Sequence, residues 1–492
     1  MSAPPFARRS SATGVSVATL CLTAFVVMVD TTIVQVMVPD LIGDLGAGLD
    51  QVLWVFNGFV LVYATLLITA GRMGGIRGPR RLLLEGLVLF TVASLACGLA
   101  GSVTQLIIAR VLQGAGGAMI VPQSLTLIAM LFPGNRRGAA LGAVSATMAL
   151  AAIVGPVGGG LIIAGWGWRW AFLVNVPICL LALALTLRHV PDLRPDRRQV
   201  LDRGGVVLAS AGLVAITYGL VEGPRHAWGA VAGPVTIPVV FAAGLALLLA
   251  FLWWERRHAD PLMPLALFRH RSFTVAGLLA CVQFTVMLGL MLVVTLHVQG
   301  VLGGSAIDTG LVYLPMAAMA GVLSPLAGWL TDRVGGGLII MGGLMAMAAG
   351  VGWFALVAAP STALSHLAPP LALVGAGVGL VMAPASAEAI KELPAGLVPA
   401  ASGVLNTGRQ LAGMLGVALV GAIIQIGVPL QAAAGLGGRA GPQGEAYASA
   451  FIAAERPALT VLAALALCAA FGAPLLRSRS RARGDRFTPM SP

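Results

Sequence analysis

Charged residues are scarce in this chain. Only 10% of its 492 residues are Asp, Glu, Lys or Arg, whereas 58% are hydrophobic, and the mean hydropathy is +0.94. A soluble protein needs about 25% charged residues to cover its surface in water. The scarcity excludes an ordinary soluble domain and indicates that most of the surface faces lipid.

Cysteine is also scarce, and the residues of a catalytic centre are missing. The five cysteines lie in separate apolar runs, so we interpret them as packing residues rather than as disulfides or metal ligands. No Gly-Lys-Ser/Thr loop that could cradle a phosphate is present, which argues against direct use of ATP. We therefore expect no enzymatic activity, no metal and no cofactor.

The chain contains many long apolar runs. Each is about as long as a membrane-spanning helix requires, roughly 20 residues, and none alternates as barrel strands do. The first run is too long for the core of a cleavable signal and is read as helix 1. The sequence predicts an all-α polytopic membrane protein with fourteen transmembrane helices, near 15–38, 51–71, 82–101, 105–131, 138–163, 168–187, 204–222, 233–254, 273–299, 307–331, 337–358, 364–389, 401–426 and 456–476.

The net charge of +12 could suggest a nucleic-acid partner, but its distribution does not. If the N-terminus is cytoplasmic and the spans alternate, almost all basic residues outside the membrane fall on the cytoplasmic side. The outer loops then hold only Arg169, Arg225, Arg439 and Arg456. This asymmetry predicts that both termini face the cytoplasm and that the chain lies in the cell membrane, with no nucleic-acid partner.

Two polar linkers, 188–205 and 255–273, divide the chain. They predict two pseudo-symmetric six-helix bundles with a two-helix insert between them. The turns "GRMGGIRGPRR" (71–81) and "GWLTDRVGGG" (328–337) echo each other, which favours a transporter built from repeated bundles. The predicted parts are a cytoplasmic tail (1–14), an N-terminal bundle (15–187), the linkers and inserted helices (188–272), a C-terminal bundle (273–476) and a basic cytoplasmic tail (477–492).

Four motifs together carry a resemblance to a known family. They are "VDTTIVQVMVP" (29–39), "RVLQGAGGAMIVPQSL" (110–125), "GAVSATMALAAIVGPVGGG" (142–160), which continues into "WGWRWAFLVNVPI" (166–178), and the turn at 71–81. In this order they resemble the fourteen-helix drug:proton antiporter branch of the major facilitator superfamily. Gln35 stands where that branch usually has Asn, and Ala151 replaces one expected Gly.

The resemblance implies roles for several residues in conformational change. The turn after the second helix normally carries Asp-Arg and acts as a latch, but Gly75 and Ile76 occupy those places here. The copy after the tenth helix keeps both residues and is expected to carry more of the latch function. The conformational residues that the resemblance implies are Gly71, Gly78, Arg80, Gly155, Pro156, Gly159, Gly160, Gly328, Asp332 and Arg333. Gly155, Gly159 and Gly160 also favour close helix packing. Pro156 is expected to kink the same helix.

Asp30 is the residue that most needs an explanation. An ionised carboxylate at a helix centre costs about 2.5–3.5 kcal/mol in a membrane, so it needs water, a partner or a neutral form. Because burial favours the neutral form, this side chain could couple a proton to transport. The alternative is a structural carboxylate that is hydrogen-bonded to neighbours such as Thr31 or Thr32. Arg110 is expected to influence that carboxylate or to tie its helix to neighbouring carbonyl groups, and Gln113 to share its contacts.

A largely apolar cavity with soft and aromatic side chains would accept varied compounds. The candidate lining residues, which could equally be core packing, are Gln35, Trp54, Asn57, Tyr63, Gln113, Gln283, Phe284, Met287 and Met291. Because Asp30 is the one clear acid at mid-membrane depth, monovalent or neutral hydrophobic compounds are favoured over dications.

The remaining polar residues of the spans are expected to play lesser roles. We expect Glu222 to lie off the main path, Asp308 to interact with a helix dipole, and Glu85 to pair with Arg81. Glu388 is expected to be solvated and Arg409 to reach the interface. His297 and His366 are interpreted as lone histidines near the outer helix ends.

The sequence therefore favours a monomeric, proton-driven exporter of small hydrophobic or cationic molecules in the lipid bilayer. Two alternatives stay open: a dedicated exporter of one endogenous metabolite or lipid, and a receptor or membrane scaffold that transports nothing.

Overall fold

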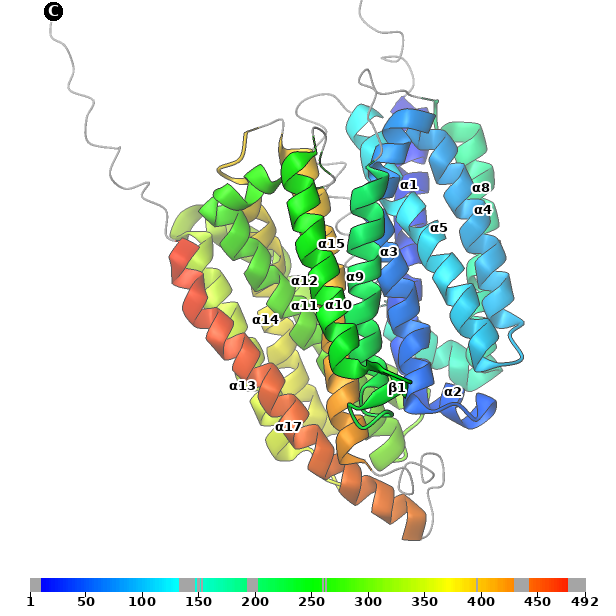
Figure 1. Ribbon diagram of the computed structural model, residues 1–492, viewed down its shortest axis with the longest axis vertical. Coiled ribbons are helices and arrows are strands. Elements are labelled where there is room, and N and C mark those ends of the chain that lie inside the picture. Colours follow the sequence, from blue (N-terminus) through cyan, green and yellow to red (C-terminus); the bar gives the residue numbers. More distant parts are fainter. Residues whose placement is uncertain are drawn as a thin grey trace, which may run out of the picture.

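The structure, a computed structural model, describes residues 10–131, 147, 151, 154–192, 202–258, 261, 263–394, 397–428 and 442–476. Within these residues, thirteen helical spans are long and apolar enough to cross a membrane, and Val154–Trp166 is a shorter apolar helix. The predicted all-α polytopic membrane protein is confirmed (Figure 1). The predicted fifth span, 138–163, falls largely outside the described residues.

The helices of the first half are α1 (Ser10–Ile33), the 3₁₀ turn η1 (Val34–Met37), α2 (Val38–Leu45), α3 (Leu49–Arg77), α4 (Pro79–Gly98), α5 (Val103–Leu131), the helix Val154–Trp166, α7 (Trp168–Leu173) and α8 (Asn175–His189). The inserted helices α9 (Arg203–Glu222) and α10 (Ile237–Arg257) are joined through a short antiparallel hairpin of β1 (Ala230–Ala232) and β2 (Val235–Thr236). The second half contains η2 (Leu265–Arg269), α11 (Arg271–Leu296), the π-helical turn η3 (His297–Val301), α12 (Ala306–Val334), α13 (Gly336–Val357), α14 (Leu364–Ile390), α15 (Val398–Gly427), α17 (Pro442–Gly472) and η5 (Ala473–Leu476).

The sequence predicts one continuous helix over 15–38, but in the structure this span is interrupted after Ile33. Pro39 has no backbone N–H and its ring crowds the carbonyl group four residues earlier, so the α-helical pattern cannot continue through it. The chain passes through η1 and restarts as α2 with Pro39 in its first turn. In Figure 1, α2 and β1 lie at the same end of the bundle, which we call the α2 end.

The same pairs of helices pack together in both halves. The contacts α3–α5, α4–α5, α4–α8 and α1–α8 recur as α12–α14, α13–α14, α13–α17 and α11–α17. The turns that precede α4 and α13 also match, since Gly78 and Gly335 have φ of 95° and 90°, a conformation that favours glycine. The internal repeat seen in the sequence is therefore also a repeat in how the helices pack.

The inserted pair lies between the two halves (Figure 1). Helices α9 and α10 pack against each other, and α9 also contacts α3 and α15. At the α2 end, Trp54 on α3 donates a hydrogen bond to Glu222 of α9 at 3.0 Å. Arg225 pairs with Asp50 at 3.2 Å beside it. Glu222 thus helps to dock the insert.

Asp202 caps the start of α9. Its carboxylate accepts hydrogen bonds from the backbone N–H of Gly205 and from the indole of Trp254, each at 2.9 Å. Burial raises the pKa of the Asp202 carboxyl, but these hydrogen bonds and the charge of His258 outweigh it, so the pKa lies below its ordinary value.

We expect Asp202→Ala to destabilise the α9–α10 pair by about 1 kcal/mol, the usual cost of losing an N-cap. Because the pKa of Asp202 is lowered by folding, the wild-type cap stabilises above the ordinary pKa of an aspartate and loses this effect as the pH falls through the lowered pKa. Amide hydrogen exchange in the first turn of α9 measures this. Equal exchange in the two proteins at neutral pH would contradict it.

Candidate proton-coupling site

Asp30 lies in the last turn of α1 and is completely buried. Its Oδ2 pairs with Nη1 of Arg110 on α5 at 2.5 Å, and the Arg110 side chain is also completely buried. Two amides complete the site: Gln113 and Asn175 each donate to Oδ1 of Asp30, at 2.9 and 2.8 Å. One carboxylate therefore joins α1, α5 and α8.

The guanidinium of Arg110 is held from several sides. Its Nε donates to the carbonyl oxygen of Val55 on α3 at 3.2 Å, and Nη1 also donates to Gln113 Oε1 at 2.7 Å. Its Cζ lies 4.1 Å from the ring centroid of Phe59 and 5.6 Å from that of Phe172. Nη2 is buried without a hydrogen-bond partner among the described residues. This end of the guanidinium is therefore buried with its hydrogen-bonding capacity unused by the described part of the chain.

Close helix packing puts Arg110 at this point. A Cβ atom on Gly114 of α5 would collide with the carbonyl oxygen of Phe59 on α3, so only glycine permits this approach. Gly114 is one turn after Arg110, and the approach brings the guanidinium against the α3 backbone at Val55 and the ring of Phe59.

Gln113 extends the network away from the carboxylate. Its Nε2 donates to Ser94 Oγ on α4 at 2.7 Å as well as to Asp30, while its Oε1 accepts from Arg110. The expectation that Gln113 shares the contacts of Arg110 is confirmed. Ser94 and Asn175 were not predicted, although Asn175 was visible as the amide within the apolar run "WRWAFLVNVPI".

The threonines beside Asp30 do not bind it. Thr31 donates to the carbonyl oxygen of Val27, and Thr32 to those of Met28 and Val29. The two threonines named for the structural alternative are therefore wrong, but the carboxylate is hydrogen-bonded to other neighbours, namely Arg110, Gln113 and Asn175. Within a helix these hydroxyls reach back to the preceding turn, as threonines commonly do.

The site has two chemically distinct states. The ionised carboxylate accepts from three N–H donors and neutralises Arg110, an arrangement that suits a buried pair. Adding a proton removes the charge that holds Arg110 and replaces an acceptor with a donor. Protonation of Asp30 would thus loosen the junction of α1, α5 and α8.

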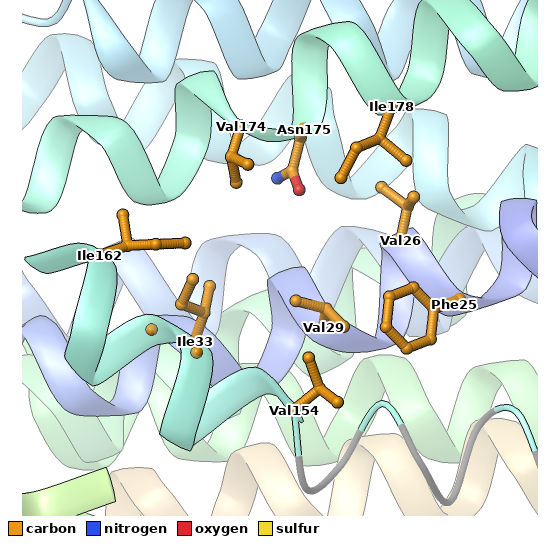
Figure 2. A pocket seen from close by; sticks show the side chains of 11 residues that line it. Phe25, Val26, Val29, Ile33, Val154, Ile162, Val174, Asn175 and Ile178 are labelled. Atoms are coloured by element: carbon orange, nitrogen blue, oxygen red, sulfur yellow. The ribbon is translucent and has the colours of Figure 1, made fainter. Parts of the chain in front are cut away.

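An apolar pocket leads to the site between α1, the helix Val154–Trp166 and α8. Asn175 is the only polar side chain among the residues that line it, and in Figure 2 it points from α8 toward α1. The same amide donates to Asp30. The other lining residues are Phe25, Val26, Val29, Ile33, Val154, Gly158, Gly159, Ile162, Val174 and Ile178.

The glycines of the helix Val154–Trp166 make close approaches in two directions. On α1, a Cβ atom on Gly155 would collide with Thr32, and one on Gly159 would collide with Ile33. One on Gly160 would collide with the carbonyl oxygen of Ala306 in α12. This agrees with the packing interpretation of these glycines, and it joins the two halves near the α2 end.

A hydrogen bond adds to the contact between the halves at this end. The Gln299 side chain in η3 donates to the carbonyl oxygen of Val36 in η1 at 2.7 Å. Backbone atoms of Gly310 in α12 also lie close to Pro156. The described helices of the two halves therefore touch directly at the α2 end.

Seven of the nine candidate lining residues lie on α3 and α11, while Gln113 lies on α5 and Gln35 in η1; α15 contacts both α3 and α11. Asn57, Tyr63 and Gln283 are buried, and the amide atoms of Asn57 and Gln283 have no hydrogen-bond partner among the described residues. Such orphaned amides are the polar groups that a bound molecule could satisfy.

Three other predicted lining residues are engaged elsewhere. Trp54 uses its indole N–H on Glu222, and Phe284 lies 5.8 Å from the Arg409 guanidinium. The backbone carbonyl of Met291 accepts from Tyr313 at 2.5 Å, and its side chain is buried. Met287 is half-buried. The side chain of Gln35 lies outside the described residues.

The two copies of the latch turn make different contacts. In the first, which follows Gly71 near the end of α3, Arg80 donates to the carbonyl oxygen of Leu187 at the end of α8, at 2.7 Å. In the second, Arg333 lies over the ring of Trp329 at 3.9 Å and is exposed. A Cβ atom on Gly328 would meet open space. The side chain of Asp332 lies outside the described residues.

Two expectations for the second half are wrong. Glu388 is buried rather than solvated, because it accepts from the backbone N–H of Gly336 at the start of α13, at 3.1 Å. Arg409 does not reach the interface, because it lies within α15 and donates to Ser386 at 2.8 Å and to the carbonyl oxygen of Met382.

The remaining local expectations can be compared with the contacts. Glu85 pairs with Arg81 at 3.0 Å, as expected. Asp308 accepts from the backbone N–H of Ser305 and so caps α12, which agrees with its expected place at a helix N-terminus. His297 is not a lone histidine, since Glu455 lies 2.9 Å away. Among the described residues, no group of three His, Cys, Asp or Glu is placed to hold a metal ion.

Comparison with known proteins gives the family. The family model of the Major Facilitator Superfamily matches residues 20–417. The chain is 34% identical over 401 residues to the multidrug resistance protein Stp of Mycobacterium tuberculosis, covering 81% of this chain and 74% of that protein. It is also 34% identical over 400 residues to the tetracenomycin C resistance and export protein of Streptomyces glaucescens, covering 81% and 73%.

A solved structure shows the same fold. A bacterial homologue of the human lysosomal transporter Spinster, in an inward-facing and occupied conformation, superposes with a TM-score of 0.67. The superposition covers 94% of this chain and 96% of the other at 18% sequence identity. With the membrane-spanning helices, the repeated packing and the family match all in agreement, the chain belongs to the major facilitator superfamily and is a multi-pass membrane transporter.

Proposed function

We propose that the protein is a proton-driven antiporter that exports hydrophobic or amphipathic compounds across the cytoplasmic membrane. The observation that carries the proposal is the fully buried Asp30–Arg110 pair with its two amide donors. A buried ionisable residue in a transporter is a candidate proton carrier because its charge is costly unless it is paired or neutralised. The names of the two resistance proteins support drugs as substrates.

The proposed cycle follows from the two states of the site. While Asp30 is ionised, its carboxylate holds α1, α5 and α8 together through Arg110 and Asn175. A proton that arrives from outside neutralises the carboxylate and releases Arg110, whose free Nη2 then finds another acceptor. The junction loosens, the helices change their packing, and access switches to the cytoplasm, where the proton leaves.

The direction of transport follows from the topology that we propose. The positive-inside distribution favours cytoplasmic termini, so the α2 end faces outward. The proton gradient is then the energy source and no cofactor is needed. We propose that the protein works as a monomer, and that monovalent or neutral molecules occupy the space near Asn57, Tyr63 and Gln283.

Transport by the purified protein tests this function. Proteoliposomes with an imposed pH gradient are given ethidium, a monovalent amphipathic cation, or puromycin at equal starting concentrations inside and outside. We expect movement against the compound's gradient that a protonophore abolishes. A dedicated metabolite exporter would move neither compound yet respond to its own substrate, and a scaffold would move nothing. Movement that ignores the pH gradient would contradict proton coupling.

A further inference from the structure

A second pair of buried ionisable side chains lies outside the Asp30 site. His297, the first residue of η3, has its Nδ1 2.9 Å from Oε2 of Glu455 in α17. Both residues are completely buried. We propose that His297 and Glu455 form a second proton-binding site, which holds one proton between them within the C-terminal helices.

The pair is incompletely satisfied, which distinguishes it from an ordinary structural contact. Nε2 of His297 and Oε1 of Glu455 are both buried with no hydrogen-bond partner among the described residues. A buried ion pair that serves stability alone is worth its desolvation cost only when its remaining polar atoms are bonded. Here one donor and one acceptor site stay open, as a pair that takes up and releases a proton requires.

The surroundings make proton loss costly while the site is sealed. The imidazole lies 5.8 Å from the ring of Phe354 on α13 and 6.5 Å from that of Phe451 on α17. The protonated pair is neutral overall, whereas the deprotonated pair carries an uncompensated negative charge among apolar rings. The proton is therefore retained until water or another proton acceptor reaches the pair.

The other titratable groups on the helices around the pair do not compete with it for the proton. On α17, Tyr447 packs over Gly300 of η3, and Arg456, which follows Glu455, is exposed and faces away from the pair. Helix α13 has no titratable residue along Gly336–Val357. On α12, Asp308 caps its own helix and Tyr313 is bonded to Thr295.

The position of the pair repeats that of the Asp30 site. Asp30 bonds Asn175 across α1 and α8, and His297 bonds Glu455 across α11 and α17, the matching helix pair of the second half. In the second half the contact lies within the irregular turn η3, and in the first half it lies one helical turn before η1. Single π-helical turns often mark functional sites.

The pair is also linked to the contact between the halves. Gln299, which donates to Val36 of η1, belongs to the same π-helical turn as His297. A change in the proton content of the pair would therefore act on the segment that joins the halves at the α2 end.

Nitrogen NMR of histidine in lipid nanodiscs tests the assignment directly. The chain has six histidines, and replacing the other five (His189, His226, His258, His270 and His366) with glutamine leaves His297 as the only labelled ring. Over about pH 5 to 9 we expect its ring nitrogens to change between protonated and neutral signals. We expect Glu455→Gln to abolish this titration and leave His297 neutral, since the stabilising carboxylate is gone.

A ring that keeps one protonation state over this range would overturn the proposal, and so would a titration unaffected by Glu455→Gln. Should the Gln variant not fold, Glu455→Asp keeps a carboxylate at a different distance and is expected to shift the titration midpoint. The NMR arm is independent of the proposed transport function. A second arm rests on that function: proton flux per exported ethidium falls in Glu455→Gln and stays at the wild-type value in His366→Gln.

Discussion

Replacing Asp30 by asparagine is expected to reduce proton-driven export of ethidium to the level of liposomes without protein. Asparagine keeps one oxygen, which can accept either from Arg110 in the place of Oδ2 or from Gln113 in the place of Oδ1, so part of the network remains and the helices can still assemble. It cannot take up or release a proton, so the two states of the site no longer exist. Transport driven by a pH gradient in proteoliposomes measures the loss.

The folded state of this variant must be verified separately. Arg110 loses its buried counter-charge, and removing one partner of such a pair typically costs about 3–5 kcal/mol. We therefore expect Asp30→Asn to fold, with a lower unfolding temperature. Asp44→Asn is the matched control, because Asp44 lies just beyond η1 in α2 and its side chain is 59% exposed. The control should export at the wild-type rate, and export by Asp30→Asn at that same rate would refute the coupling role.

The second large effect concerns Arg110. Arg110→Gln leaves the Asp30 carboxylate buried without a cation, and we expect a loss of about 3–5 kcal/mol in the free energy of unfolding. The positions of α1, α3 and α5 all depend on this guanidinium, which also donates to the backbone of Val55. Denaturant or thermal unfolding in detergent measures the change.

A double-mutant cycle separates stability from transport. In Asp30→Asn combined with Arg110→Gln, no buried charge is left unpaired, so the loss in stability should be clearly smaller than the sum of the two single losses. Export should stay absent, since no proton carrier is restored. Additive losses would show that the two side chains are not energetically coupled, and recovered export would show that Asp30 is not the carrier.

The fold could be predicted largely from the sequence because lipid imposes a simple rule on it. The apolar runs had to form helices, and the glycine turns at 71–81 and 328–337 revealed the repeat. Local breaks were harder to predict. The interruption of the first span depends on Pro39, which disrupts the helical hydrogen bonding several residues earlier, at η1.

The site was only partly predictable. Asp30, Arg110 and Gln113 stand out because a charge or an amide in an apolar run has few explanations. Their partners on α4 and α8, Ser94 and Asn175, are small polar residues far away in the sequence, and only the packing of helices brings them together.

The same reason explains the errors on the C-terminal half. The sequence predicts a lone His297 and a solvated Glu388, because the groups that contact these two residues lie on other helices. Arg409 is expected from the sequence to reach the interface, whereas it lies eleven residues into α15, which begins at Val398. Pairing across a bundle depends on helix rotation, which the apolar pattern of a fully buried helix does not define.

The most direct test of the central claim is proton release from the purified protein when ethidium binds. The protein in weakly buffered detergent solution carries a pH indicator, and ethidium binding is followed by its fluorescence. We predict that the wild type releases protons as ethidium saturates the protein, and that Asp30→Asn binds ethidium but releases none. Binding by the wild type without proton release, or equal release from the variant, would contradict the account.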